Sequence, residues 1–270
     1  MNTPSNRVAL FVTCLVDQLM PEIGVATVRV LRRARLAAST ALQPGSGQGA
    51  TRGLRKAGAL GVDFPAAQTC CGQPFFNSGF RDEAARLAKR TIEIFEEHET
   101  VVLPSGSCTA MIRVEYPRLL AGESGWRDRA QKLAAKTFEL SAFLARCRAS
   151  FSFREALRIM YHDSCHLCRT LGLRDEPRKL LAESGCEIVE MAESDRCCGF
   201  GGLFSVRMPE VSNAMTAEKL RQAAATGVDV LVTADPGCLM QMRGMLETAD
   251  RKKGTLRIEH IAVILEERTR

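Results

Sequence analysis

Short, largely apolar runs recur along the chain and predict buried strands, and the run at 8–12 is rich in β-branched and aromatic residues. Each run is followed within a few residues by a cysteine. The four pairs are 8–12 before Cys14, 101–103 before Cys108, 158–162 before Cys165 and 228–232 before Cys238. Because functional groups gather at the carboxyl ends of parallel strands, we expect these cysteines to lie together at the edge of a sheet.

Longer stretches with apolar residues at helical spacing lie between these runs and predict helices. They cover 21–33, 80–98, 130–145, 167–184 and 209–226. We expect the fourth helix to break around Pro177, because proline interrupts helices. We expect the fifth helix to pack through Val211, Met215 and Leu220. Strands that alternate with helices predict an α/β fold with parallel sheets flanked by helices.

The order of predicted elements occurs twice, so the sequence predicts two tandem lobes related as a pseudo-repeat. We place the first lobe at 1–150 and the second at 151–270, which are ordinary domain lengths. Each lobe is expected to be a parallel sheet with a cysteine-based metal site at its strand ends. The stretch 37–60 is rich in Gly and Ser and has no equivalent in the second lobe, so we interpret it as an inserted loop.

A Cys-Cys-Gly triplet lies between the two cysteine-linked strands of each predicted lobe. Neighbouring cysteines are poorly placed to form a disulfide with each other, whereas two adjacent thiolates can bind neighbouring metal ions of one cluster. The glycine lets the backbone approach a bulky group and leaves amide N–H groups that can point at sulfur. The triplets begin at Cys70 and at Cys197.

Two sets of four cysteines follow from this repeat. The first set is Cys14, Cys70, Cys71 and Cys108, and the second set is Cys165, Cys197, Cys198 and Cys238. Thiolates select iron–sulfur clusters, zinc or copper(I). Zinc ribbons use closely paired cysteines, and the usual ferredoxin run of cysteines is absent from this sequence. We therefore predict one four-thiolate iron–sulfur site in each lobe, with zinc in one lobe as the alternative.

The remaining cysteines have no place in the repeat. Cys147 and Cys186 lack a counterpart in the other half and are expected to be small buried apolar residues. Cys168 forms a C-x-x-C pair with Cys165, but Asp17 stands at the corresponding place in the first lobe, so the repeat does not require Cys168 as a ligand.

Polar residues also flank the second set. His162 and His166 stand on either side of Cys165, and we expect them to support the site by hydrogen bonding or capping. Asp163 and Asp235 each lie shortly before a cysteine of the second set. We expect these aspartates to shape or cap the turns there. The two other histidines, His98 and His260, fall on predicted helical segments and are given no role.

Composition limits the classes of function. With 46% hydrophobic and 25% charged residues the chain is an ordinary globular protein, and its apolar runs are too short to span a bilayer. Eleven cysteines without a leader-like segment indicate metal or redox use in the cytoplasm. The formal charge of +6 arises from one basic stretch, between 23 and 62, and does not predict nucleic-acid binding. No dinucleotide fingerprint is present, so NAD or flavin binding is not expected.

The segments around the cysteines resemble the cysteine-rich CCG-domain family, which includes the cysteine-rich subunits of heterodisulfide reductase and the iron–sulfur subunits of glycolate oxidase. Within it the chain is most similar to lactate-utilisation iron–sulfur proteins. The segments that carry the resemblance are 11–17, 68–74, 104–108, 161–166, 197–202 and 235–240. The resemblance implies 4Fe-4S clusters bound by the eight cysteines. It also implies a subunit that relays electrons in an L-lactate-oxidising complex, acts on a 2-hydroxy acid, and has partners that include a ferredoxin-type iron–sulfur protein.

Two departures keep alternatives open. The heterodisulfide reductase subunits end each motif with a further C-x-x-C, whereas this chain has Met111 and Gln241 at those places. Glycolate oxidase subunits carry an additional ferredoxin-type module, which this chain lacks. The alternatives to the lactate-oxidising subunit are a thiol–disulfide reductase subunit and a zinc-bound scaffold. No catalytic residue is predicted, and we expect the chain to be inactive without its partners.

Overall fold

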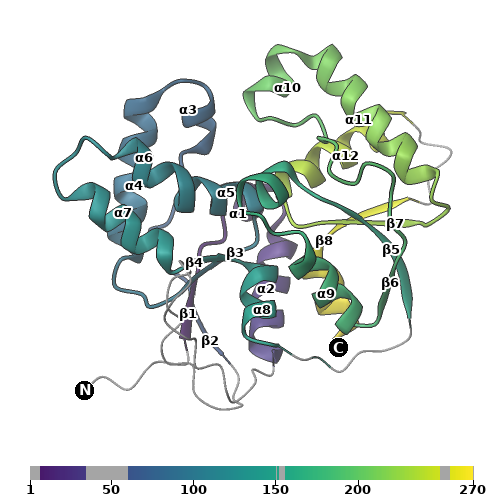
Figure 1. The fold of residues 1–270 in the computed structure, drawn as a ribbon, viewed down its shortest axis with the longest axis horizontal. Coiled ribbons are helices and arrows are strands. Elements are labelled where there is room, and N and C mark those ends of the chain that lie inside the picture. The colour runs from purple at the N-terminus through teal and green to yellow at the C-terminus, as the bar shows by residue number, and fades with distance from the viewer. Residues whose placement is uncertain (1–6, 35–59, 150, 152–155, 250–255, 270) are drawn as a thin grey trace.

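The computed structural model describes residues 7–34, 60–149, 151, 156–249 and 256–269 (Figure 1). It contains two parallel sheets of four strands. The first sheet has the order β2-β1-β3-β4, with β1 Arg7–Leu10, β2 Gly61–Asp63, β3 Val101–Leu103 and β4 Thr137–Glu139. The second has the matching order β6-β5-β7-β8, with β5 Leu157–His162, β6 Cys186–Ile188, β7 Val230–Thr233 and β8 Arg257–His260. The predicted α/β fold with two tandem repeated lobes is confirmed.

Helices follow the strands in the same pattern in both lobes. In the first lobe they are α1 Cys14–Leu19, α2 Pro21–Arg33, α3 Gln73–Asn77, α4 Arg81–Phe95, α5 Gly106–Ala110, the π-helical turn η1 Met111–Glu115, α6 Tyr116–Leu119, α7 Trp126–Ala135 and α8 Leu140–Arg146. In the second lobe they are the π-helical turn η2 His166–Thr170, α9 Asp175–Glu183, α10 Leu203–Arg207, α11 Pro209–Ala224, α12 Pro236–Ala249 and α13 Ile261–Arg268. No helix among these described segments is long and apolar enough to cross a membrane.

The two lobes share one hydrophobic core. Helices α2 and α8 of the first lobe lie between the two sheets and pack against α13 and α9 of the second lobe (Figure 1). Val30 and Leu31 of α2 and Ile264 and Leu265 of α13 are all fully buried in this core. A smaller core on the other side of the first sheet lies under α4 and α7. The boundary at 150 and 151 stays a prediction, and the buried contacts hold the two lobes together.

Two predicted helix boundaries are wrong. The segment 130–145 is not one helix, because α7 ends at Ala135 and the short strand β4 precedes α8. All three residues of β4 are buried but only Phe138 is apolar, so the strand has no apolar pattern that would separate it from the helices beside it. The break in 167–184 lies between η2 and α9 and not at Pro177, which occupies the first turn of α9. A proline fits there because its missing N–H would have no partner within the helix.

The predicted packing face of α11 is also wrong in part. Val211 is 45% exposed, whereas Ser212, Thr216 and Lys219 are buried together with Leu220. The helix therefore turns a largely polar face toward the protein, which explains why apolar spacing misplaced it. His260 ends strand β8 and accepts a hydrogen bond from the N–H of Ala262, so its placement on a helix was wrong too. Except for Leu60, the predicted inserted loop at 37–60 lies outside the described residues.

Candidate metal centre

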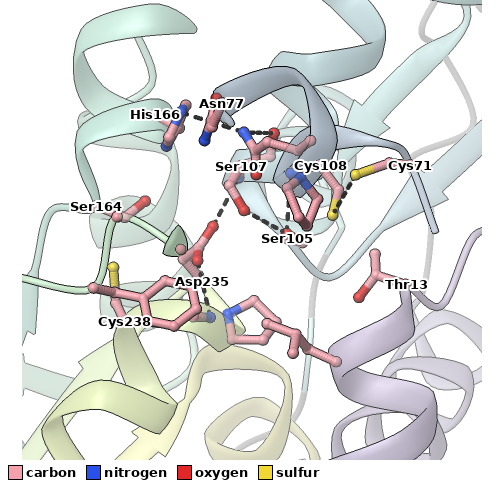
Figure 2. Close-up of a pocket in the computed structure, with 18 of the residues that line it drawn as sticks. Thr13, Cys71, Asn77, Ser105, Ser107, Cys108, Ser164, His166, Asp235 and Cys238 are labelled. Carbon is pink, nitrogen blue, oxygen red and sulfur yellow. Dashed lines mark hydrogen bonds between the residues drawn. The ribbon is translucent and has the colours of Figure 1, made fainter. Parts of the chain in front are cut away.

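All eight cysteines of the two predicted sets line a single cavity between the lobes. Its volume is about 160 Å³. Four of the cysteines lie at the start of helical segments that follow β1, β3, β5 and β7, and the other four come from the Cys-Cys-Gly loops after β2 and β6. Figure 2 shows Cys71 and Cys108 on one side of the cavity and Cys238 on the other. The sequence predicted one site in each lobe, and the structure places the two sets at one cavity.

The first set forms a chain of sulfur contacts. Cys14 contacts Cys70, Cys70 contacts Cys71, and the Sγ atoms of Cys71 and Cys108 are 3.2 Å apart. The backbone N–H of Gly72 donates a hydrogen bond to Cys70 Sγ at 3.4 Å. The glycine amide therefore points at sulfur, as the sequence predicted.

The second set repeats this chain. Cys165 contacts Cys197, Cys197 contacts Cys198, and Cys198 contacts Cys238. The backbone N–H of Gly199 donates to Cys197 Sγ at 3.4 Å, the same distance as in the first lobe. All eleven cysteines lie within the described ranges, and all are free thiols.

The pKa shifts of the cysteines are those expected of thiols that bind a metal together. Hydrogen bonds from Cys14 and then Cys71 lower the pKa of Cys70, and hydrogen bonds from Cys165 and then Cys198 lower that of Cys197. The pKa of Cys71 rises, because it donates to Cys108 and Cys70 and is buried. Four close thiolates repel one another, so they need bound cations in order to ionise together. The donor set therefore fits a thiophilic metal ion or an iron–sulfur cluster.

The glycine of each triplet allows a helix to approach the cysteine loop. Gly199 has a φ of +92°, and a Cβ atom there would lie 2.5 Å from the carbonyl oxygen of Ser212 in α11. Gly72 has a φ of +85°, and its Cβ would lie 3.3 Å from the carbonyl oxygen of Ala84 in α4. The two contacts show that Ala84 and Ser212 are equivalent positions. They also show that the second lobe is packed more tightly at this point.

Asp235 joins the two lobes at the cavity. Its Oδ2 accepts a hydrogen bond from the backbone N–H of Ser107 in the first lobe, and its Oδ1 accepts from Gly237 at the start of α12 (Figure 2). A second bond between the lobes runs from the N–H of Gly106 to the carbonyl of Ala234 at 3.3 Å. The sequence predicted that Asp235 shapes a turn, and the structure shows that it also connects the two sets of cysteines.

Asp163 holds the loop that leads to Cys165. Its buried carboxylate receives two hydrogen bonds of 2.8 Å from the Arg178 guanidinium in α9 and one of 2.7 Å from the Ser194 hydroxyl. Although burial alone would raise the pKa of Asp163, these bonds hold it below the ordinary value. The turn-shaping role predicted for this aspartate is therefore carried out through an ion pair with α9.

The other three cysteines do not line the cavity. Cys147, Cys168 and Cys186 are buried, with exposed fractions of 3%, 5% and 7%. The C-x-x-C spacing places Cys168 in η2 one turn beyond Cys165, and its Sγ lies 4.0 Å from the Cys165 carbonyl oxygen. The burial of Cys147 and Cys186 agrees with the prediction that they serve as small apolar residues, and Cys168 lies outside the cavity, where the repeat does not need it.

His162 lies closer to the second set than the sequence indicated. It is fully buried, and one of its ring nitrogens lies within 4.8 Å of the Sγ atoms of Cys198 and Cys238. Neither ring nitrogen has a hydrogen-bond partner among the described residues. Burial, and then the charge of Lys219, lower the pKa of His162 to about 4, so the ring is neutral. His166 also lines the cavity, where its Nε2 lies 3.3 Å from Gln73 Nε2 (Figure 2).

The chain matches a family of protein domains and is similar to individual known proteins over most of its length. Residues 41–113 and 159–243 match the CCG cysteine-rich domain family. The chain is 42% identical over 267 residues to Lactate utilization protein A of Bacillus subtilis (strain 168), covering 97% of this chain and 100% of the relative. It is 41% identical over 262 residues to Lactate utilization protein A of Shouchella clausii (strain KSM-K16), covering 96% and 98%.

Solved structures resemble the chain only distantly. An aspartate racemase homologue from Pyrococcus horikoshii OT3 aligns with 97% of this chain and 96% of its own length, but with a TM-score of 0.29 and 8% identity. That similarity is too low to support an inference. The family matches in both lobes enclose seven of the eight predicted cysteines, and the relatives align over nearly the whole sequence. The chain therefore belongs to the cysteine-rich CCG domain family.

Proposed function

We propose that the protein is an iron–sulfur redox subunit of a complex that oxidises L-lactate to pyruvate and that it relays the electrons from this reaction. One observation carries the proposal. Two equivalent sets of four thiols line the same cavity, in a chain that is 42% identical to a lactate utilization protein A over almost its full length. The name of that relative supports lactate as the substrate of the complex.

Each set is proposed to hold one cluster of the 4Fe-4S type. The first would be held by Cys14, Cys70, Cys71 and Cys108, and the second by Cys165, Cys197, Cys198 and Cys238. Such clusters supply one-electron transfer when bound. The chain itself contributes the thiolates, the glycine N–H groups that donate to sulfur, and a cavity lined by both cysteine sets. Asp235 keeps the two sets in a fixed relation, because it is bonded in both lobes.

Lactate oxidation removes two electrons and two protons, whereas each site handles one electron. The sequence has no dinucleotide fingerprint through which a hydride acceptor would bind. We therefore assign the oxidation of the 2-hydroxy acid to a partner subunit and the relay to this chain, with a ferredoxin-type iron–sulfur protein as a further partner. The cytoplasm is the expected compartment, because the eleven cysteines are all free thiols.

Reconstitution tests this proposal. The anaerobically purified chain should not reduce a dye acceptor with L-lactate, and activity should appear when the partner subunits are added. Replacing Cys71 or Cys198 with serine should abolish the reconstituted activity, whereas replacing Cys147 should leave it intact. Lactate oxidation by the pure chain would place the catalytic centre in this protein. Reduction of a small disulfide by the pure chain would support the thiol–disulfide reductase alternative.

A further inference from the structure

The two cysteine sets share their sulfur contacts but differ in the polarity of the residues around them. We propose that the second set holds its cluster at a more positive reduction potential than the first, so that electrons pass from the first lobe to the second. This inference rests on the proposed function. With clusters held by both cysteine sets, one electron would leave the first site and be gained at the second.

The first difference lies three residues before Cys14 and Cys165. Phe11 stands there in the first lobe, fully buried and stacked on Phe95 with ring centroids 5.1 Å apart. His162 stands there in the second lobe, beside two cysteine sulfurs and without another hydrogen-bond partner among the described residues. A buried polar ring normally has a partner, since an unsatisfied one is costly. The sulfur of a bound cluster or of its thiolates would supply that partner.

The second difference lies on the helix that packs over the glycine of each triplet. Because Ala84 and Ser212 are equivalent, Thr91 and Lys219 are equivalent as well, since each lies seven residues further along its helix. Lys219 is fully buried, and its Nζ donates to the carbonyls of Glu193 and Ser194 at 2.7 and 3.3 Å. Burial lowers the pKa of Lys219 to about 8, so its ammonium stays charged at neutral pH.

The ammonium of Lys219 acts on the second set. The two carbonyls that it binds lie four and three residues before Cys197, so its charge lies beside the loop that contains the second triplet. The uncharged Thr91 hydroxyl, by contrast, donates to the carbonyl of Leu87 within its own helix. A buried positive charge therefore lies near the second set and has no equivalent at the same position in the first.

A third difference lies three residues after Cys108 and Cys238. Met111 is buried in the apolar core of the first lobe. Gln241 in the second lobe donates to the hydroxyls of Ser212 and Thr216 at 3.1 and 3.0 Å. The Thr216 hydroxyl in turn donates to the Cys198 carbonyl at 2.8 Å. The Cys71 carbonyl receives an equivalent bond from the Tyr116 hydroxyl at 2.8 Å, so the lobes differ here in the Gln241 amide, which stands where the first lobe has an apolar methionine.

These differences act in one direction. Reducing a cluster adds negative charge, which positive charges and hydrogen bonds to sulfur stabilise, so both raise the potential. Two carboxylates that the first lobe lacks, Asp163 and Asp235, act in the opposite direction. The charge of Asp163 is balanced by its ion pair with Arg178, and the carboxylate of Asp235 accepts backbone N–H groups from both lobes. We expect Lys219 and His162 to outweigh them at the second site.

Potentiometric titration followed by EPR tests the inference on the full chain. The Cys71→Ser and Cys198→Ser variants assign each signal to its lobe. We expect the signal that remains in Cys71→Ser to titrate at a more positive potential than the one that remains in Cys198→Ser. The Lys219→Met and His162→Phe variants should each shift the second-lobe midpoint to a more negative value and leave the first-lobe midpoint unchanged.

Lys136→Met is the matched control, because the Lys136 ammonium also donates to a backbone carbonyl but lies in the first lobe away from the cavity. It should move neither midpoint. If Lys219→Met does not fold, the order of the two midpoints in the unmodified protein still decides the question. Equal midpoints, or a more negative second site, would overturn the inference. Absence of iron and sulfide would overturn the proposed function instead.

Discussion

The carboxylate of Asp235 accepts a hydrogen bond of 2.7 Å from the backbone N–H of Ser107, although 128 residues separate them in the sequence. Ser107 precedes Cys108, and Asp235 lies three residues before Cys238. The Asp235 side chain also receives the N–H of Gly237 at 3.0 Å and is 4% exposed. One buried carboxylate therefore links the turn before Cys108 to the turn before Cys238.

Replacing Asp235 with alanine should destabilise the protein. The change leaves the N–H groups of Ser107 and Gly237 without their acceptor, which costs about 1–3 kcal/mol in the free energy of unfolding. Urea denaturation followed by circular dichroism measures this difference. Asp82→Ala is the control, because Asp82 is an exposed acid in the first turn of α4 and should change the unfolding free energy little. Equal stabilities for the two variants would contradict the role of Asp235.

Alanine at Gly199 should damage the second site more than alanine at Gly72 damages the first. A Cβ at Gly199 would lie 2.5 Å from a carbonyl oxygen, whereas a Cβ at Gly72 would lie 3.3 Å from one. Both positions have positive φ, so the shared backbone strain of about 1–2 kcal/mol cancels in the comparison. Iron content after anaerobic purification and the urea midpoint measure the effects. The prediction fails if Gly72→Ala loses more iron than Gly199→Ala.

The buried ion pair between Arg178 and Asp163 should contribute more to the free energy of unfolding than the exposed ion pairs near it. Arg178→Ala leaves a fully buried carboxylate unpaired and should reduce the free energy of unfolding by about 3 kcal/mol. The matched change is Arg174→Ala, because Arg174 pairs with Asp195 where both side chains are solvent-exposed. That variant should unfold close to the unmodified protein. A thermal shift of equal size in both variants would argue against the buried pair.

Glu139 should make stability depend on pH. Burial raises the pKa of Glu139 to about 7, while hydrogen bonds from the N–H groups of Ser141 and Ala142 lower it in part. The folded chain therefore keeps this proton where the unfolded chain, with an ordinary carboxyl pKa of about 4.3, has lost it. The stabilising contribution is complete below about pH 4 and is lost as the pH rises through 7.

Glu139→Gln removes this titration. The stability of the unmodified protein relative to Glu139→Gln should fall by roughly 3 kcal/mol between pH 4 and pH 8, measured by urea denaturation at each pH. Histidines and other carboxyls titrate in both proteins, so the difference isolates Glu139. A difference that stays constant over this range would show that the carboxyl is already ionised in the folded state.

Much of the fold could be read from the sequence because strong local signals coincided with the repeat. The runs before Cys14 and Cys165 are largely apolar and buried, and they form the inner strands β1 and β5. Strands β2, β4 and β6 have only three residues each and, unlike the equally short β3, each contains polar residues, so no apolar run identifies them. The polar inner face of α11 could not be recognised either, because burial of Lys219 depends on carbonyl groups from another segment.

The cysteine sets could be proposed from spacing alone, but their common cavity could not. Its position depends on how α2 packs against α13 and α8 against α9, which no local pattern encodes. The sequence indicated a role for His162 only weakly, through its position three residues before Cys165. Its position beside Cys198 and Cys238 depends on how β5, the second triplet and α12 come together in the folded lobe.

Metal and sulfide analysis of the anaerobically purified chain tests the central claim most directly. Iron, acid-labile sulfide and zinc should be measured in the unmodified protein, in Cys71→Ser, in Cys198→Ser and in the double variant. If each set holds one cluster, each single variant should lose about half of the iron and sulfide, and the double variant should lose nearly all of both. Stoichiometric zinc without sulfide, or iron that persists in the double variant, would contradict the claim of two iron–sulfur sites at one cavity.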